Sequence, residues 1–184
     1  MPAVRFDQLP DSSRVWIFAS DRRLQDSEAR TLLATVDEFL SQWKAHGSPL
    51  RSAREWRENR FLVIGVDPTV EQASGCSIDG LFRGLQTLEG SLGTRLVAGG
   101  RVFYRDASGE PQLAARAELS SLAARGVLRE EMPVFDTSIT NAGAYREGFE
   151  RPARETWVAS LLAPAQDSQA SSRSATKSSS VRNG

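Results

Sequence analysis

The sequence predicts an α+β fold, on the basis of two apolar runs, two amphipathic segments and the order in which they occur. Val15–Phe18 and Phe61–Val66 are short apolar runs of the kind that form buried strands. Segments 27–45 and 78–92 instead repeat apolar residues at intervals of about three to four, which is the spacing of an amphipathic helix. Strand and helix therefore alternate in the first half of the chain, as expected for a sheet with helices on one face.

Both helices carry recognisable end signals. The first is expected to begin at Asp26–Ser27 and to be closed by Gly47 in the position that follows a helix. The second is expected to have Ser77 as its N-cap and Gly93 as its stop. It also contains Gly80 and Gly84, and because glycine is a poor helix former, we interpret this pair as a sign that another element or a ligand approaches closely.

Two structures are compatible with segment 48–59. Ser52 and Glu55 fit a capping box, and the arginines and glutamates around them are helix formers, which favours a short helix. Alternatively, Leu50–Arg57 is a strand that a tight turn at Glu58–Asn59 joins to the following apolar run. We prefer the hairpin because it completes the β-α-β-β-α-β order of a ferredoxin-like, or split βαβ, sheet.

The remainder of the chain is expected to add a strand and a helical extension. Arg101–Arg105 is the predicted last strand, and Asp106–Gly109 the turn that closes it. Ala114–Arg125 is rich in alanine and predicts a helix that stops at Gly126. Pro133–Asp136 is expected to be extended, and the residues after it loosely helical. A thioredoxin-like α/β domain is the alternative fold.

Length and composition limit the classes of protein to consider. The 184 residues suffice for one domain, expected over 1–163, and a tail over 164–184. The tail is rich in serine and nearly free of large apolar residues, so we expect it to be disordered. Basic and acidic residues balance at 23 each, which argues against a nucleic-acid binder.

Several chemistries are excluded by what the chain lacks. Cys76 and His46 are the single cysteine and the single histidine, so neither a disulfide within the chain nor a zinc site of several thiolates or imidazoles is expected. The chain has two lysines, Lys44 and Lys177, and neither follows a glycine, so the sequence contains no phosphate loop. We expect no metal and no cofactor. Without a signal segment or an apolar span, the protein is expected to be cytoplasmic and not in a membrane.

The hairpin interpretation brings Cys76 and His46 to the same end of the sheet, whereas a helical crossover at 48–59 would separate them. Cys76 lies at a helix N-terminus, where the dipole favours a thiolate, and His46 is expected in the last turn of the first helix. We therefore hypothesise a catalytic group in which Cys76 is the nucleophile, His46 the base or ion-pair partner and Asp79 the residue that orients them.

The same end of the sheet is a candidate ligand site. Ser74 and Gly75 precede the second helix and can expose backbone N–H groups to an anion, with Ser77 and Gly47 beside them. The connection 68–76 is longer than most loops, as functional loops often are. The competing interpretation is structural, because a single cysteine is commonly an inert packing residue and the polar residues can serve only as helix caps.

Four segments of the chain carry a family resemblance: Arg14–Ile17, Trp43-x-x-His46-Gly47, Asn59–Phe61 and Ser74–Asp79. Through them the sequence resembles a small family of bacterial proteins that is often labelled "ABC transporter ATPase". The resemblance extends over most of 6–160 and is most specific at Ser74–Asp79. The label implies ATP hydrolysis, but the chain lacks a phosphate loop, and the family implies no established activity.

Three functions are then compatible with the sequence. The first is a binding module whose residues 68–79 hold an anionic small molecule or a protein partner. The second is a thiol-dependent enzyme that uses Cys76 with His46. The third is a scaffold or assembly subunit. The residues leave the ligand and the oligomeric state open.

Overall fold

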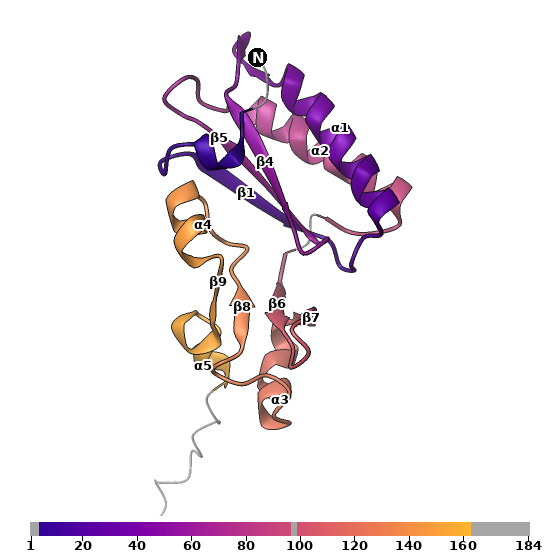
Figure 1. The fold of residues 1–184 in the computed structure, drawn as a ribbon, viewed down its shortest axis with the longest axis vertical. Coiled ribbons are helices and arrows are strands. Elements are labelled where there is room, and N and C mark those ends of the chain that lie inside the picture. The colour runs from indigo at the N-terminus through magenta and orange to yellow at the C-terminus, as the bar shows by residue number, and fades with distance from the viewer. Residues whose placement is uncertain (1–3, 97–98, 163–184) are drawn as a thin grey trace, which may run out of the picture.

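The computed structural model describes residues 4–96 and 99–162, and Figure 1 shows that they form two layers of sheet with helices outside. The first sheet is antiparallel, with β5 (Phe61–Val66) between β1 (Arg14–Ala19) and β4 (Ser52–Arg57). Helices α1 (Asp26–Gln42) and α2 (Gly75–Leu92) cover one face of this sheet. The α+β class is therefore confirmed.

The hairpin preferred for segment 48–59 is also confirmed. β4 pairs antiparallel with β5 from Ser52 opposite Val66 to Arg57 opposite Phe61. Glu58 and Asn59 make the turn with φ of 56° and 49°, the left-handed conformation that hairpin turns of type I′ require. Asparagine adopts this conformation more readily than most residues, which explains why the chain reverses here.

The second sheet is the main departure from the expected topology. Arg101–Arg105 does form a strand, β6, but it joins a separate antiparallel sheet instead of lying beside β1, so the ferredoxin-like detail is not confirmed. Its strand order is β7-β6-β8-β9, and no parallel pair of the thioredoxin kind occurs among the described strands. The other strands are β7 (Pro111–Ala115), β8 (Pro133–Phe135) and β9 (Glu150–Pro152).

The expected helix over Ala114–Arg125 is partly wrong, because β7 occupies its first residues. Ala114 faces inward from the strand and is buried, while a 3-10 turn (Arg116–Glu118) leads into the short helix α3 (Leu119–Ala124). Gly126 ends the segment with φ of 68°, as expected. The C-terminal part is thus a sheet with short helices, α4 (Ala142–Gly148) and α5 (Ala159–Leu162), and a 3-10 turn (Ala153–Glu155).

The first sheet is buried on both faces, which explains the continuous apolar run in β5. Leu62 and Ile64 belong to the core beneath α1 and α2, whereas Phe61 and Val63 belong to a second core against the second sheet and α4. Gly65 faces this second core, where an added Cβ would lie only 2.5 Å from Leu9 Cδ1. A third core lies on the far face of the second sheet, under α3 and α5.

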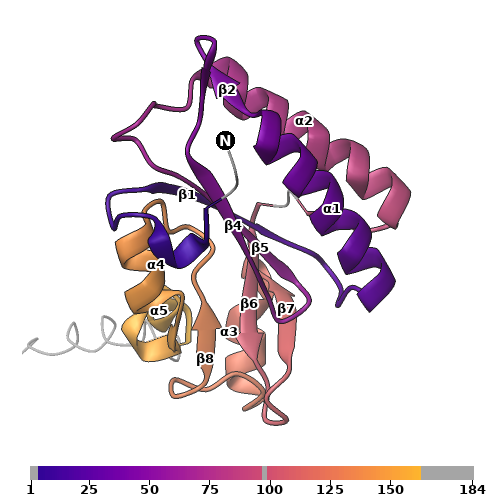
Figure 2. The same ribbon diagram turned by 45° about the horizontal axis from the view of Figure 1, so that its top comes forward.

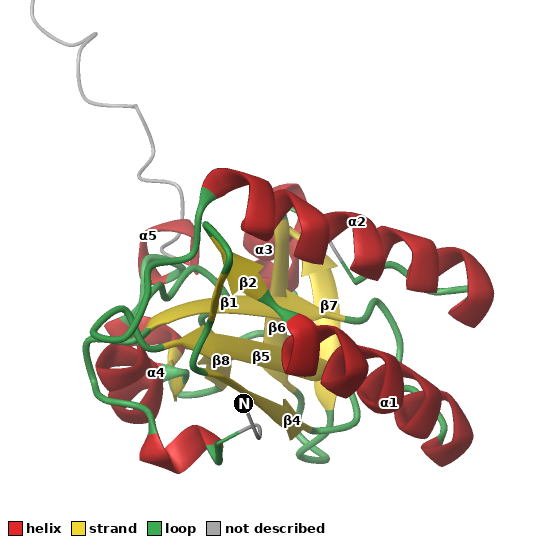
Figure 3. Cartoon of the chain, turned by 90° about the horizontal axis from the view of Figure 1, so that it is seen from above, coloured by secondary structure: helices red, strands yellow, loops and turns green. Residues whose placement is uncertain are grey.

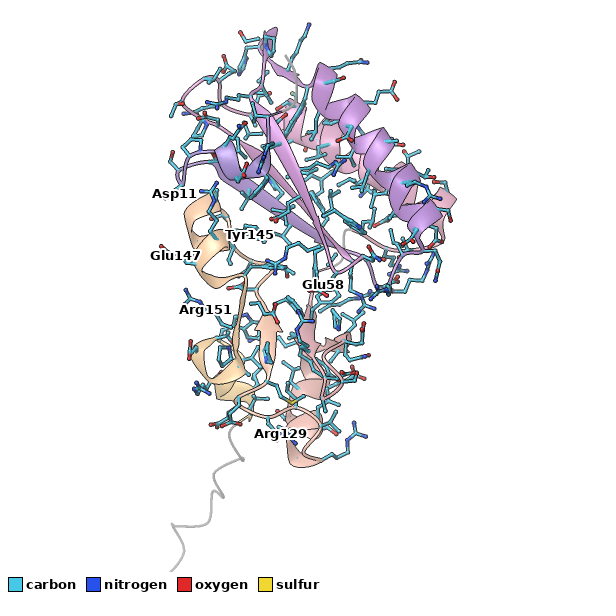
Figure 4. The ribbon with its side chains drawn as sticks, viewed as in Figure 1. Asp11, Glu58, Arg129, Tyr145, Glu147 and Arg151 are labelled. Atoms are coloured by element: carbon cyan, nitrogen blue, oxygen red, sulfur yellow. The ribbon has the colours of Figure 1, made fainter. Side chains whose placement is uncertain are left out.

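A polar junction holds the two sheets together beside the second core. Arg105 donates to Glu150 at 2.6 and 3.0 Å and to Glu58 at 3.0 Å. The Tyr145 hydroxyl donates to Glu55 at 2.6 Å, and burial together with this bond raises the pKa of Tyr145 well above its usual value. Figure 4 shows Glu58 and Tyr145 where the two layers meet.

The glycines of α2 do not have the packing role that the sequence suggested. An added Cβ at Gly84 or Gly90 would meet nothing within 4 Å, and at Gly80 only the Phe39 ring at an ordinary 3.9 Å. The interpretation of Gly80 and Gly84 as points where another element approaches closely is therefore wrong within the described structure, whereas approach of a ligand stays a prediction. Gly93 ends the helix at φ 59°, as expected.

We expect Gly84→Ala and Gly90→Ala each to stabilise the protein by about 0.5–1 kcal/mol. Alanine fits the open space and removes the backbone entropy that glycine loses on folding. Urea unfolding at neutral pH measures the change. Gly93→Ala is the matched control and should destabilise, because its Cβ is strained at positive φ. A loss of stability in Gly84→Ala would contradict this account of the helix.

Two predictions concern the chain as a whole. Among the described residues, no helix combines the length and apolar character needed to cross a membrane. The predicted disordered tail, 164–184, lies outside the described residues.

Candidate functional site

The candidate site lies at the end of the first sheet where α1 ends and α2 begins. We call it the hairpin end after the small hairpin over 44–49, which is distinct from the β4–β5 hairpin. After α1, strands β2 (Lys44–Ala45) and β3 (Ser48–Pro49) pair antiparallel and leave His46–Gly47 as a two-residue turn. Both turn residues have positive φ, 50° and 84°. The prediction that His46 lies in the last helical turn and that Gly47 caps the helix is therefore wrong. Both residues are exposed at the tip of a small hairpin.

The first turn of α2 begins three residues earlier than its expected cap. Ser74 is the N-cap, and its Oγ accepts from Ser77 N at 3.2 Å. Ser77 was expected in that position, but it lies inside the helix and its hydroxyl donates to Ser74 O at 2.8 Å. Gly75 and Cys76 are then the first two helical residues, and both are exposed. Their N–H groups are among those that a helix leaves without intrahelical partners.

Trp43 joins the small hairpin to α2. Its indole Nε1 donates to Ser77 O at 2.9 Å, and β2 contacts α2. Its ring packs against Phe39 and Trp16, with centroids at 5.5 and 6.0 Å. Figures 2 and 3 show the hairpin beside the two helices at this end. The strand directions therefore bring the segments of His46 and Cys76 to one end of the sheet, as the hairpin interpretation required.

The three side chains of the hypothesised catalytic group are not joined to one another. Within the described ranges, no hydrogen bond or ion pair involves the side chain of His46, Cys76 or Asp79. All three residues are exposed, with Asp79 in the turn of α2 after Cys76. The structure thus has the thiol and the imidazole on elements that meet, without a formed Cys–His pair.

An open hollow of about 520 Å³ lies beside the hairpin and was not anticipated. Phe39 and Trp43 provide apolar surface, and the exposed residue Lys44 also lines it. Trp43 is itself a buried core residue, and its spacing to His46 is visible in the sequence. The remaining lining residues are Thr35, Glu38 and Gln42.

Asp67 braces the loop that leads to this end. Its side chain is 1% exposed and accepts from Thr69 N and Oγ1 at 2.9 and 2.6 Å, while Arg51 donates at 3.0 Å. Burial alone would raise the pKa of Asp67, but the bonds from Thr69 and the Arg51 guanidinium outweigh it and lower the pKa below its usual value. The ionised carboxylate therefore fixes the start of the loop.

Asp67→Asn is expected to lower the free energy of unfolding by about 1–3 kcal/mol at pH 7. Because the pKa of Asp67 is lower in the folded than in the unfolded chain, its contribution is complete above about pH 5 and is lost as the pH falls below about 4. Urea unfolding from pH 3 to 7 should show the variant converging on the wild type in acid. The exposed Glu131→Gln is the control. An equal difference at pH 3 and pH 7 would contradict the assignment.

The described residues contain no group of three or more histidine, cysteine, aspartate or glutamate side chains arranged to hold a metal ion. Comparison of the chain with family profiles, with curated proteins and with solved structures yields no match. The function therefore has to be argued from the geometry of the hairpin end.

Proposed function

We propose that the hairpin end is a binding site for an anionic small molecule, contacted by Ser74, Gly75, Ser77 and Gly47. The observation that carries this proposal is the hydrogen bond from Trp43 Nε1 to Ser77 O at 2.9 Å. It holds one wall of the hollow against the first turn of α2. The N–H groups that can bind an anion and an apolar surface thereby lie side by side.

The chemistry favours a carboxylate or a phosphate attached to a small apolar body. The backbone N–H groups of Gly75 and Cys76 and the dipole of α2 attract negative charge, and the exposed Lys44 adds a full positive charge nearby. Phe39 and Trp43 would contact the apolar part. The anionic group can belong to a free molecule or to a side chain of a protein partner.

The test is a thermal-shift series with butyl phosphate, hexanoate and inorganic phosphate at constant ionic strength. We expect at least one probe to raise the melting temperature of the wild type, because a ligand that binds only the folded state stabilises it. The shift should fall by at least half in Lys44→Ala and in Ser77→Ala. Arg30→Ala, on the exposed surface of α1, is the matched control. No shift with any probe, or equal shifts in all four proteins, would falsify the proposal.

A second candidate function is thiol-dependent catalysis, favoured by the exposure of Cys76 in the first turn of α2. There the dipole assists a thiolate, and His46 on the adjoining hairpin would act as base. The rate of alkylation by iodoacetamide against pH separates this function from simple binding. A midpoint clearly below about 8.5, the value of an unperturbed thiol, that rises in His46→Asn supports it. A midpoint near that value in both proteins removes it.

A further inference from the structure

A separate cavity of about 370 Å³ lies at the end of the second sheet where β6 begins and β8 ends, and it shares no lining residue with the hollow of the hairpin end. Its size falls within the range of small-molecule sites. Phe135 provides buried apolar surface, and Trp157 an aromatic ring whose residue is 42% exposed. Arg101 and Arg116 line the same cavity.

The arginines give this cavity an excess of positive charge. Arg116 is held at the start of β6 by a bond from its backbone N to Gly100 O at 3.2 Å. Its guanidinium lies over the Trp157 ring, 4.7 Å from the centroid, and has no carboxylate within 4 Å in ranges 4–96 and 99–162. Arg101 forms an ion pair with Asp21 at 3.7 Å, so Arg116 is the guanidinium without a carboxylate partner.

The one carboxylate in the lining is already engaged. Asp136 Oδ1 accepts from Ser138 N at 2.9 Å and from Ser138 Oγ at 2.5 Å. These bonds close a local turn and hold the carboxylate in place, and the lining then carries two guanidinium groups against this one carboxylate. The two guanidinium groups therefore remain the groups best placed to bind a ligand.

We infer that this cavity binds a small molecule that combines a flat ring with a phosphate or carboxylate group. Arginine forks donate in pairs to such oxygens, and these charge-assisted bonds are stronger than neutral ones. The planar guanidinium of Arg116 and the ring of Trp157 offer stacking surface to the flat part, with Phe135 behind. An anion alone would use only half of the site, and so would a neutral ring.

The test measures binding of phenyl phosphate, benzoate, inorganic phosphate and phenol by calorimetry, using the full chain. We expect phenyl phosphate or benzoate to bind with a Kd of about 1 mM or tighter, the affinity expected for so few atoms. Phosphate and phenol should each bind at least tenfold more weakly. The preferred member of the first pair shows whether the site favours phosphate or carboxylate.

Two variants separate the roles of charge and ring. Arg116→Gln should weaken binding of the ring-bearing anions at least tenfold, and Trp157→Leu should remove their advantage over inorganic phosphate. Arg129→Gln, another exposed arginine outside the cavity, should bind as the wild type does. Lys44→Ala should keep the component of binding that Arg116→Gln removes, which separates this site from the hairpin end. Binding weaker than 10 mM for both ring-bearing anions, or unchanged in Arg116→Gln, overturns the inference.

Discussion

Phe61→Ala is expected to lower the free energy of unfolding by about 3–5 kcal/mol, a large part of the stability of a typical domain. Phe61 is fully buried in β5 and meets three further rings, Phe103, Phe135 and Phe149, at centroid distances of 5.1, 4.7 and 5.2 Å. These rings come from the second sheet and from the residue after α4. Truncation at this position therefore leaves a cavity between the two layers.

Urea unfolding and solubility on expression measure this effect. Phe61→Leu keeps most of the volume and should lose about 1–2 kcal/mol, so it remains measurable if the alanine variant does not fold. Phe82→Ala is the matched control, because Phe82 is only partly buried and pairs with one ring, Phe18, at 5.3 Å. Its loss should be about half that of Phe61→Ala. Equal losses in the two alanine variants would show that the contact between the sheets contributes little.

Arg105→Ala is expected to cost about 2–3 kcal/mol, the second largest effect among the predicted substitutions. The side chain is 21% exposed and donates to Glu150, to Glu58 and to Gly109 O, and its guanidinium lies 5.0 Å from the Phe135 ring centroid. Its removal leaves Glu58 and Glu150 facing each other at the polar junction. The remaining cation, Arg57, is 3.9 Å from Glu150.

Arg105→Lys distinguishes geometry from charge. Lysine keeps the positive charge but cannot donate as a fork to Glu150, so less than half of the lost stability should return. Arg129→Ala, labelled at the far end of the molecule in Figure 4, should change stability by no more than about 0.5 kcal/mol. Full recovery in Arg105→Lys would refute the fork as the source of the stability.

The reversal at Glu58–Asn59 shows what could be predicted from sequence for the site. Two strands joined by a short polar turn are a local pattern, and the antiparallel direction that follows places the end of α1 and the start of α2 together. The positions of His46 and Ser77 were mispredicted by a few residues. In both places neighbouring residues compete for the same cap or turn, and a short-range hydrogen bond decides between them.

The charged lining of the second cavity could not have been found from the sequence. Arg101 and Arg116 lie at the open end of the β6–β7 hairpin, whereas Trp157 is distant from both along the chain, and each one alone is an ordinary surface residue. They share a cavity because β6 and β7 pair and because the chain returns after β8. No local sequence pattern predicts that these three residues line one cavity.

The main strands and helices of the first sheet were determined by the sequence itself, because apolar spacing and residues such as Gly93 and Asn59 act within a few positions. Tertiary structure alone decided which strands share a sheet. Phe61 and Val63 face away from α1 and α2, and a second layer had to cover them. Burying that face of the first sheet stabilises the fold through contacts between residues distant in the chain. For this reason β6 belongs to the second sheet and does not pair with the edge strand β1.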